Sequence, residues 1–204
     1  IHGIFGIVDG SSLGNMSSPC SKLYRREFLV QNHIQFDAKL INGEDGVFNL
    51  EAILRTEKYE LYPKSFYQYR IYTESSSKRY SERFFESNLR YFSLVEKLLK
   101  DGKIKEEEIR RCLSYAVTYS VYLYLYLVST IAEKSKRSSA LMNLKNPRLR
   151  EYTRKYRKSK ECNKIIQLIY WFVQHGMFFV GEQIVWLRNA VRRQQKQELR
   201  WLYI

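Results

Sequence analysis

The chain has 204 residues, of which 45% are hydrophobic and 27% are charged, and it carries a formal net charge of +14 at pH 7. A chain of this length and balance buries a sizeable core, which excludes a disordered chain and a mini-protein that depends on disulfides or metals. Its three cysteines are widely separated and odd in number, which argues against a disulfide framework and favours a reducing compartment.

The positive charge is concentrated in the C-terminal half. Residues 1–100 hold 14 Lys and Arg against 12 Asp and Glu, whereas residues 101–204 hold 21 against 9. Such asymmetry favours a polyanionic or acidic partner, with a purely solubilising basic surface as the alternative. The chain begins at Ile1 rather than Met, so we expect a piece of a longer protein, and the lack of an N-terminal signal carries no meaning.

Residues 1–80 predict a small segment that mixes helix with one or two strands. The stretch Ile1–Val8 predicts a short strand or a packed arm, followed by a loop. Ser18 is a good helix cap and Pro19 suits the first helical position, so we expect a helix over 19–32.

The rest of this segment is short and broken by turns. Apolar residues alternate over 33–40, which predicts a strand or an extension of the preceding helix. Residues 42–46 predict a turn, and Asn49 a cap for a short helix. The stretch 65–73 alternates most clearly and is the best strand candidate in the chain.

From Ser81 onward the pattern is helical. Ser81 predicts the start of a helix that ends with Gly102 in the left-handed capping position. Its expected inner face comprises Phe85, Leu89, Phe92, Val95 or Glu96, and Leu99. The next helix is expected over 104–134, with three consecutive glutamates in its first turns, where they favour the helix dipole.

Two further helices complete the expected bundle. The pair Asn146 and Pro147 predicts a helix that carries a basic stretch, continues into the apolar run 165–173 and stops at His175. The last helix is expected over 178–199. Val180, Ile184, Leu187 and Val191 are predicted to lie on one stripe of it.

These elements predict a mainly α fold. We expect a bundle of roughly four to six helices over 81–204, with a smaller N-terminal α+β or irregular segment over 1–80 packed against it in one compact domain.

Two uncharged runs raise the alternative of a membrane-associated helical hairpin. Residues 112–132 and 165–181 lack charge, and the loop between them, 133–164, holds 12 Lys and Arg against 3 Glu. However, the first run contains five tyrosines and the second is shorter than the ~20 residues of a span. Both features favour the core helices of a soluble bundle, and membrane contact is not our expectation.

Recognisable catalytic motifs are missing, so we expect neither an enzyme nor a cofactor. His175, before a glycine at a helix end, is expected to act as a cap. Cys20 and His33 are a remote candidate for two ligands of a metal shared with a partner chain. Cys112 and Cys162 lie among apolar helical residues and are expected to be buried structural thiols.

Basic and aromatic side chains are the candidate binding residues. Over 148–160, Arg150, Arg154 and Arg157 or Lys158 are spaced i, i+4 and i+7 or i+8. This spacing gives the predicted helix a cationic face that can bind successive phosphates. The candidates for nucleic acid or an acidic partner are Arg148, Arg150, Arg154, Lys155, Arg157, Lys158, Arg192 and Arg193. The candidates for protein contacts are Tyr152, Tyr156, Trp171, Trp186 and Trp201.

Our leading hypothesis is a non-enzymatic adaptor or scaffold in a nuclear chromatin, telomere or ribonucleoprotein assembly. Its helical grooves would hold peptide segments of other proteins, and the chain would also self-associate as a homodimer. The second hypothesis is direct binding of DNA or RNA through the basic helix face. The expected compartment is the nucleus or the cytoplasm.

Overall fold

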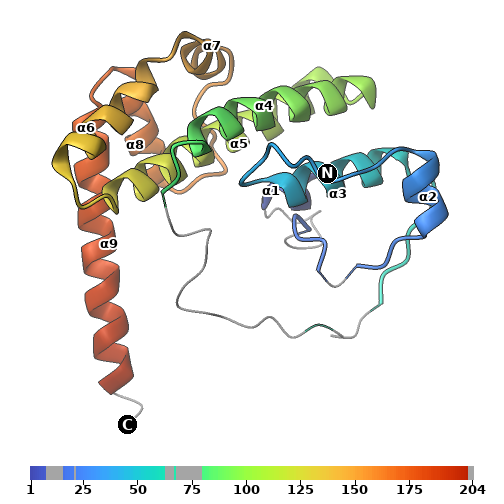
Figure 1. The fold of residues 1–204 in the computed structure, drawn as a ribbon, viewed down its shortest axis with the longest axis horizontal. Helices are drawn as coiled ribbons and strands as arrows, with labels where there is room; N and C mark the ends of the chain where they lie inside the picture. Colours follow the sequence, from blue (N-terminus) through green and yellow to red (C-terminus); the bar gives the residue numbers. More distant parts are fainter. Residues whose placement is uncertain (8–15, 21, 63–66, 68–79, 202–204) are drawn as a thin grey trace. The chain divides into compact units, whose positions relative to one another are not determined.

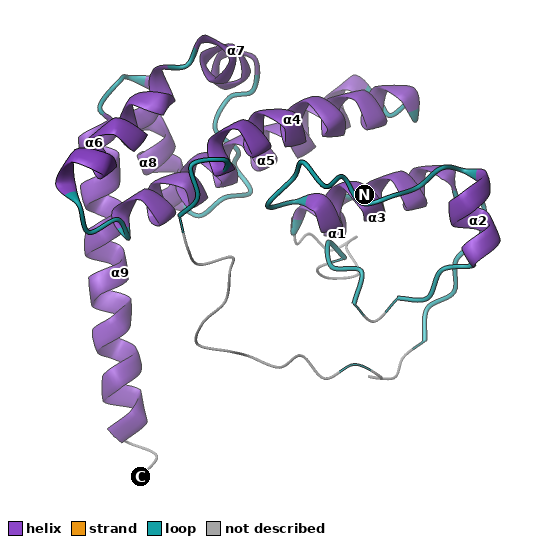
Figure 2. Ribbon diagram, in the orientation of Figure 1, coloured by secondary structure: helices purple, strands orange, loops and turns teal. Residues whose placement is uncertain are grey.

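We describe the protein from a computed structural model. It describes residues 1–7, 16–20, 22–62, 67 and 80–201, with the backbone alone for 192–201. The fold is mainly helical, as predicted, and Figure 2 shows helices and loops but no strand among these residues. The strand predicted over 65–73 lies outside the described residues except for Tyr67.

The described part of the chain contains nine α-helices and one short 3₁₀ helix (Figure 1). In chain order these are α1 (His2–Phe5), α2 (Arg26–Gln31), α3 (Glu44–Arg55), α4 (Phe84–Asp101), α5 (Glu106–Ser129), α6 (Lys134–Met142), η2 (Asn143–Lys145), α7 (Pro147–Lys155), α8 (Lys164–Gln174) and α9 (Phe178–Trp201). The count of six α-helices from residue 81 onward agrees with the predicted bundle.

The helices group into two compact units. Unit 1 comprises Ile1–Lys78 and Arg83–Ala116, and unit 2 comprises Arg79–Glu82 and Val117–Ile204. The boundary therefore falls inside α5, which contributes its first half to one core and its second half to the other. The expected arrangement of 1–80 and 81–204 in one domain stays a prediction.

Unit 1 is built around α3, which packs against α1 and α4. A small core of Ile34, Phe48 and Ala52 forms beside it. Asn49, predicted as a cap, lies inside α3 instead and is buried. Its side-chain amide donates to the Asp45 carbonyl at 3.0 Å, and its oxygen accepts from the hydroxyl of Tyr24. Asn49 therefore ties the segment before α2 to α3.

Several N-terminal predictions are wrong for identifiable reasons. Ile1–Val8 begins with a helical turn, α1, rather than a strand. Ser18 accepts from the Cys20 N–H at 3.2 Å, so it closes a turn rather than capping a helix, and α2 starts only at Arg26. Residues 33–40 form no strand, and just after them the Ile41 N–H donates to Ser87 Oγ at 2.9 Å.

The turn predicted over 42–46 is the first turn of α3. Gly43 takes a left-handed conformation at φ 87°, and the Val47 N–H bonds to its carbonyl at 3.0 Å. Glu44 and Asp45 then lie in the first helical turn, where negative charge favours the dipole. A Cβ at Gly43 would lie 2.7 Å from the Tyr91 ring, so this position also requires glycine sterically.

The predicted inner face of α4 is confirmed. Phe85, Leu89, Phe92, Val95 and Leu99 are all buried, and Val95 rather than Glu96 completes the face. The predicted cap is wrong in detail, because Gly102 is right-handed at φ −74°. The left-handed residue is Lys103, at φ 53°.

Helix α5 ends earlier than predicted. Near its C-terminus, Ser129 Oγ donates to the Tyr126 carbonyl at 2.7 Å and Thr130 Oγ1 to the Leu127 carbonyl at 2.6 Å. Hydroxyls that bond back to carbonyls three residues earlier satisfy the orphan acceptors of a helix end. The chain then starts a separate helix, α6, which periodicity did not predict.

Unit 2 contains the basic helix, and its predicted start is confirmed. Asn146 Oδ1 accepts from the Arg148 N–H at 2.9 Å, with Pro147 in the first turn. The predicted continuation into 165–173 is wrong, because α7 ends at Lys155 and α8 starts anew behind an Asn163 cap. Between them, the Tyr156 carbonyl accepts from Tyr170 Oη at 2.9 Å, and the Ser159 N–H donates to Thr118 Oγ1 at 3.0 Å.

The extent of α9 is as predicted and the four predicted residues share one stripe, but that stripe is not the buried side of the helix. The buried side chains are Phe178, Glu182 and Val185, together with Gly181. A Cβ on Gly181 would meet the Leu125 side chain at 3.4 Å and the Ile169 carbonyl oxygen at 3.7 Å. Close approach at this glycine fixes which side of α9 faces inward. The predicted stripe of Val180, Leu187 and Val191 is exposed, and Ile184 is partly exposed.

Among the described residues, α5 passes a length and composition test for a membrane span, and 61% of its most apolar stretch is buried inside the protein. A central core helix passes the same test. The second uncharged run forms α8, which has 11 residues and is therefore about 16 Å long. That is about half the thickness of the hydrocarbon core of a bilayer.

Candidate partner-binding surfaces

A pocket of about 590 Å³ lies between α7 and the C-terminal end of α8, within unit 2. We call it the basic pocket. It is lined by Leu144, Leu149, Arg150, Thr153, Arg154, Arg157, Lys158, Trp171, Val173, Gln174, His175 and Gly176. The structure therefore brings the predicted basic residues together with one predicted aromatic anchor, Trp171, which lies on a different helix, α8. The basic residues are Arg150, Arg154, Arg157 and Lys158.

The helical register of α7 positions the cations. Leu149 and Thr153 point inward and are buried, so Arg150 and Arg154, one residue further along the helix, are turned outward. Arg157 and Lys158 follow the end of α7, where Tyr156 is extended at φ −110°. Arg150, Arg154, Arg157 and Lys158 thus line one pocket, although only the first two lie on a helix face as predicted.

The end of α8 supplies the opposite wall. The Trp171 ring lies 4.2 Å from the His175 ring at a tilt of 35°, and His175 Nδ1 donates to the Trp171 carbonyl at 2.8 Å. Gln174 Nε2 donates to the Thr153 carbonyl at 2.9 Å, which joins the two walls directly. Gly176, at φ 76°, then turns the chain away. These contacts fix the end of α8 against α7.

The charge of the pocket is uncompensated within the described part of the chain. No carboxylate lines it, and no ion pair or side-chain hydrogen bond joins Arg150, Arg154, Arg157 or Lys158 to any described residue. Clustered like charges destabilise a surface through mutual repulsion, and a bound anion relieves that repulsion. The pocket is therefore electrostatically suited to an anionic ligand.

Helix α9 carries the second surface. The exposed apolar side chains Phe179, Val180, Trp186, Leu187 and Val191 form what we call the apolar strip. At 100° per residue they fall within roughly 140° of the helix circumference, on the side opposite the buried residues. Trp186 is 51% exposed and Leu187 58% exposed. In Figure 1 the C-terminal half of α9 extends past α6 and α8, clear of the other helices of unit 2.

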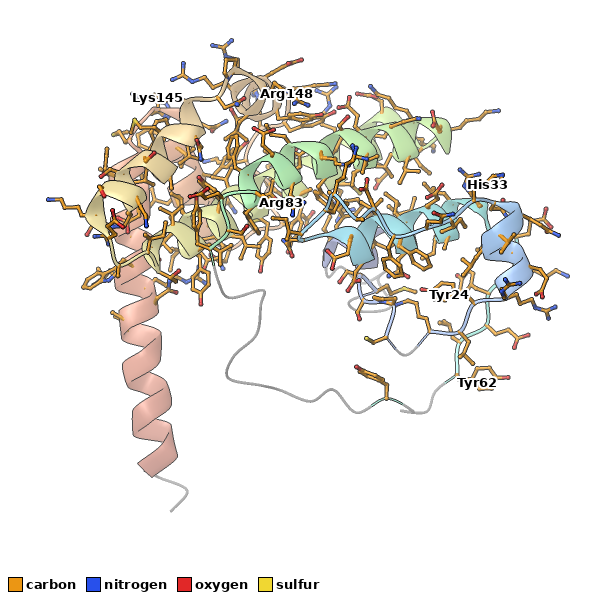
Figure 3. The ribbon with its side chains drawn as sticks, in the orientation of Figure 1. Tyr24, His33, Tyr62, Arg83, Lys145 and Arg148 are labelled. Carbon is orange, nitrogen blue, oxygen red and sulfur yellow. The ribbon has the colours of Figure 1, made fainter. Side chains whose placement is uncertain are left out.

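Other predicted binding residues have different positions. Tyr156 is only 1% exposed and belongs to the core, so its assignment to partner contact is wrong. Tyr152 is partly buried and stacks on Tyr156, and Lys155 Nζ lies 5.3 Å from the centroid of the Tyr156 ring. Arg148 is exposed beside Lys145 at the start of α7 but does not line the pocket (Figure 3). The side chains of Arg192, Arg193 and Trp201 lie outside the described residues.

That Cys20 and His33 supply two ligands to a metal shared with a partner chain stays a prediction. Cys20 lies in the loop before α2 and His33 just after it. Over the described residues, no group of three or more His, Cys, Asp or Glu side chains is arranged to hold a metal. Cys112 and Cys162 are buried, as predicted, and burial raises the pKa of each thiol to about 12. These two cysteines are therefore protonated at neutral pH.

The sequence did not predict the three polar, formally uncharged side chains of the pocket, Thr153, Gln174 and His175. The stop at His175 was predicted, but one-dimensional periodicity does not show that a helix end faces another helix. Phe179 was also missed as an exposed residue. The signal was present, because apolar residues cover more of α9 than one buried face needs.

Comparison of the chain with protein-family models, with curated proteins and with solved structures finds no match. The two surfaces are therefore interpreted from their own residues.

Proposed function

We propose that the protein is a non-enzymatic helical adaptor that holds an acidic amphipathic helix of a partner protein on the apolar strip of α9. The observation that carries this proposal is the strip itself. Five large apolar side chains remain exposed on one side of a helix whose opposite side is already packed. Trp, with neighbouring arginines, is enriched among the residues that dominate binding energy at protein interfaces.

Charge complementarity selects the occupant. Over 178–201 the sequence has five Lys and Arg against two Glu, and one of these, Glu182, is buried. A second copy of α9 would bring like charges together, whereas a helix with acidic flanks would neutralise them. Anchors at i, i+3, i+4 and i+7 on such a helix form one apolar face that can pack against the strip. A nuclear or ribonucleoprotein assembly is the setting that we propose.

A designed peptide tests the proposal. It is a labelled helix with leucines at i, i+3, i+4 and i+7 and glutamates elsewhere, and its binding is compared with that of a scrambled peptide of equal composition. We expect the full chain to bind the patterned peptide at least about tenfold more tightly, and Leu187→Asp with Val191→Asp to abolish the difference. Met142→Asp with Leu168→Asp is the matched control, because it adds the same two charges at exposed apolar residues of α6 and α8. It should bind like the parent.

Three outcomes contradict the proposal. Equal affinities for the patterned and scrambled peptides would show that binding depends on charge attraction alone and not on the apolar strip. Sedimentation equilibrium could instead show a dimer that Leu187→Asp dissociates. That result would mean that the strip binds a second copy of the chain. Cosedimentation with anionic vesicles that is lost in Leu187→Asp would mean that the strip binds a membrane surface.

A second function, binding of nucleic acid, is favoured by the uncompensated cations of the basic pocket. Each phosphate neutralised makes affinity more salt-sensitive, so we expect binding of oligonucleotides to weaken steeply between about 50 and 200 mM salt. Arg150→Glu, Arg154→Glu and Arg157→Glu together should abolish it. Lys145→Glu, Lys160→Glu and Lys164→Glu, with an equal change in charge outside the pocket, should weaken it far less.

A further inference from the structure

We infer that the basic pocket is a nucleotide-binding site for single-stranded nucleic acid, in which a base stacks on Trp171 and the arginines of the α7 wall hold the adjoining phosphates. This inference rests on the second proposed function and specifies its ligand. It combines two features that meet only in the folded chain: the cations of α7 and an exposed indole at the end of α8.

Trp171 is positioned as a stacking platform. Its side chain is 39% exposed while the residues beside it, Tyr170 and Val173, are buried. Phe172 packs edge-on against the indole at 5.2 Å and 76°, and His175 packs against it at 4.2 Å. A ring held by two neighbours loses little conformational freedom when a base stacks on it, which favours binding.

The opposite wall is suited to phosphate. Arginine presents a planar fork of donors that matches phosphate oxygens, and three arginines line this wall. The Gln174–Thr153 hydrogen bond fixes α7 to α8 at the same level, so the arginines and the indole keep their spacing. The pocket volume, about 590 Å³, falls in the range of sites for small organic ligands.

The arrangement favours a single strand over a duplex. In a duplex the bases are stacked on each other and the phosphates lie outside, so a base does not reach an indole at the side of a pocket. In a single strand every base offers a free face, and a positive groove with an aromatic platform is how proteins bind such strands. A phosphorylated peptide would use the cations but leave the indole without a planar partner.

The test is fluorescence anisotropy of the full chain with a labelled single-stranded oligothymidine, the same strand in a duplex, and a phosphoserine peptide. We expect the single strand to bind most tightly. Trp171→Ala should weaken that binding about 5- to 150-fold, as loss of one stacked base implies, and leave duplex binding unchanged. Trp171→Phe should retain most of the affinity. Trp186→Ala, which removes a similarly exposed indole outside the pocket, should have no effect.

The outcomes separate this inference from the function on which it rests. Unchanged single-strand affinity in Trp171→Ala, with loss in the triple arginine variant, would overturn the stacking site but keep nucleic-acid binding. No binding of either nucleic acid by the parent at low salt would overturn both. Tighter binding of the phosphopeptide would also overturn the inference. If the triple variant unfolds by circular dichroism, Arg154→Gln alone, with an expected loss of several-fold, replaces it.

Discussion

Units 1 and 2 use their charged side chains differently. In unit 1 arginines and lysines meet carboxylates: Arg90 lies 2.6 Å from Asp37, Arg55 2.8 Å from Glu51, and Lys100 2.7 Å from Glu96. In unit 2, Lys136 and Arg137 have acidic partners, but the cations of the basic pocket have none among the described residues.

The same contrast holds for apolar side chains on the long helices. Helix α4 in unit 1 buries its whole predicted stripe, whereas α9 in unit 2 buries one face and exposes a second. Charges and apolar groups that are matched internally serve the fold. Unmatched groups that gather on one surface are available to a ligand, and the two surfaces of this kind described above both lie on unit 2.

Thiol reactivity gives the largest expected effect and tests whether each unit has a closed core. Only the thiolate reacts, and burial raises the pKa of Cys112, in unit 1, and Cys162, in unit 2, to about 12. A hydrogen bond with Ser18 lowers the pKa of Cys20 below its ordinary value. At pH 8 we expect Cys20 to react with a disulfide reagent roughly 1000-fold faster than the other two.

The measurement is mass spectrometry of a time course, with a sample in urea as the control, where all three cysteines should react. Rates should rise with pH up to the pKa of each thiol, so those of Cys112 and Cys162 should still be rising above pH 10. A rate for Cys112 or Cys162 equal to that of Cys20 in the folded protein would show that the core of its unit is open.

A matched pair of leucines tests the contrast between α4 and α9. Leu89→Ala removes a buried side chain and should lower the free energy of unfolding by about 2–5 kcal/mol. Leu187→Ala removes an exposed side chain from a helix and should change it by less than about 0.5 kcal/mol. Urea unfolding measures both, and a cost for Leu187→Ala as large as that for Leu89→Ala would mean that the apolar strip is buried.

The buried hydroxyl of Tyr124 in unit 2 is satisfied internally, and Tyr124→Phe tests what this contributes to stability. Tyr124 Oη is buried, donates to the Ala140 carbonyl at 2.7 Å and accepts from Asn143 Nδ2 at 3.1 Å. Without this hydroxyl, the Ala140 carbonyl and the Asn143 side-chain amide each lose a hydrogen-bond partner, which should lower the free energy of unfolding by about 1–3 kcal/mol. Tyr126→Phe on the same helix, at a partly exposed position, is the control and should be nearly neutral in thermal unfolding.

The smallest expected change in the free energy of unfolding comes from a comparison of two arginines, Arg90 and Arg154. Arg90→Ala removes an ion pair from a partly exposed site and should cost about 0.2–1 kcal/mol, while Arg154→Ala should cost nothing or stabilise slightly by reducing repulsion.

The pH dependence of this effect follows from Asp37. Burial is the largest single effect and would raise the pKa of this carboxyl, but the hydrogen bonds and positive charges of Arg90 and Lys39 together outweigh it, so the pKa lies below its usual value of 3.8. The contribution is therefore present above about pH 4 and is lost as the pH falls through the lowered pKa. Unfolding of parent and Arg90→Ala at pH 7 and pH 2.5 checks this, and a difference that grew in acid would contradict it.

The helices of the C-terminal half were predictable where local signals decide them. Asn146 with Pro147 marked the start of α7, and the spacing from Phe85 to Leu99 marked the buried face of α4. Prediction failed where a side chain bonds to a distant segment. Thr118 and Tyr170 hold the break after α7, and Gly181 selects the inner face of α9, so neither feature appears in the periodicity of the segment itself.

The sequence by itself determined that this protein is helical, basic in its C-terminal half and rich in aromatic residues, because helix periodicity, capping and net charge are properties of neighbouring residues. It also supplied the members of the candidate face, Arg150, Arg154, Arg157 and Lys158. Only the tertiary structure decided that Trp171 shares a pocket with them, that Tyr156 is core and that Leu187 is exposed. Burial and proximity depend on which helices pack together, and that packing joins residues far apart in the chain.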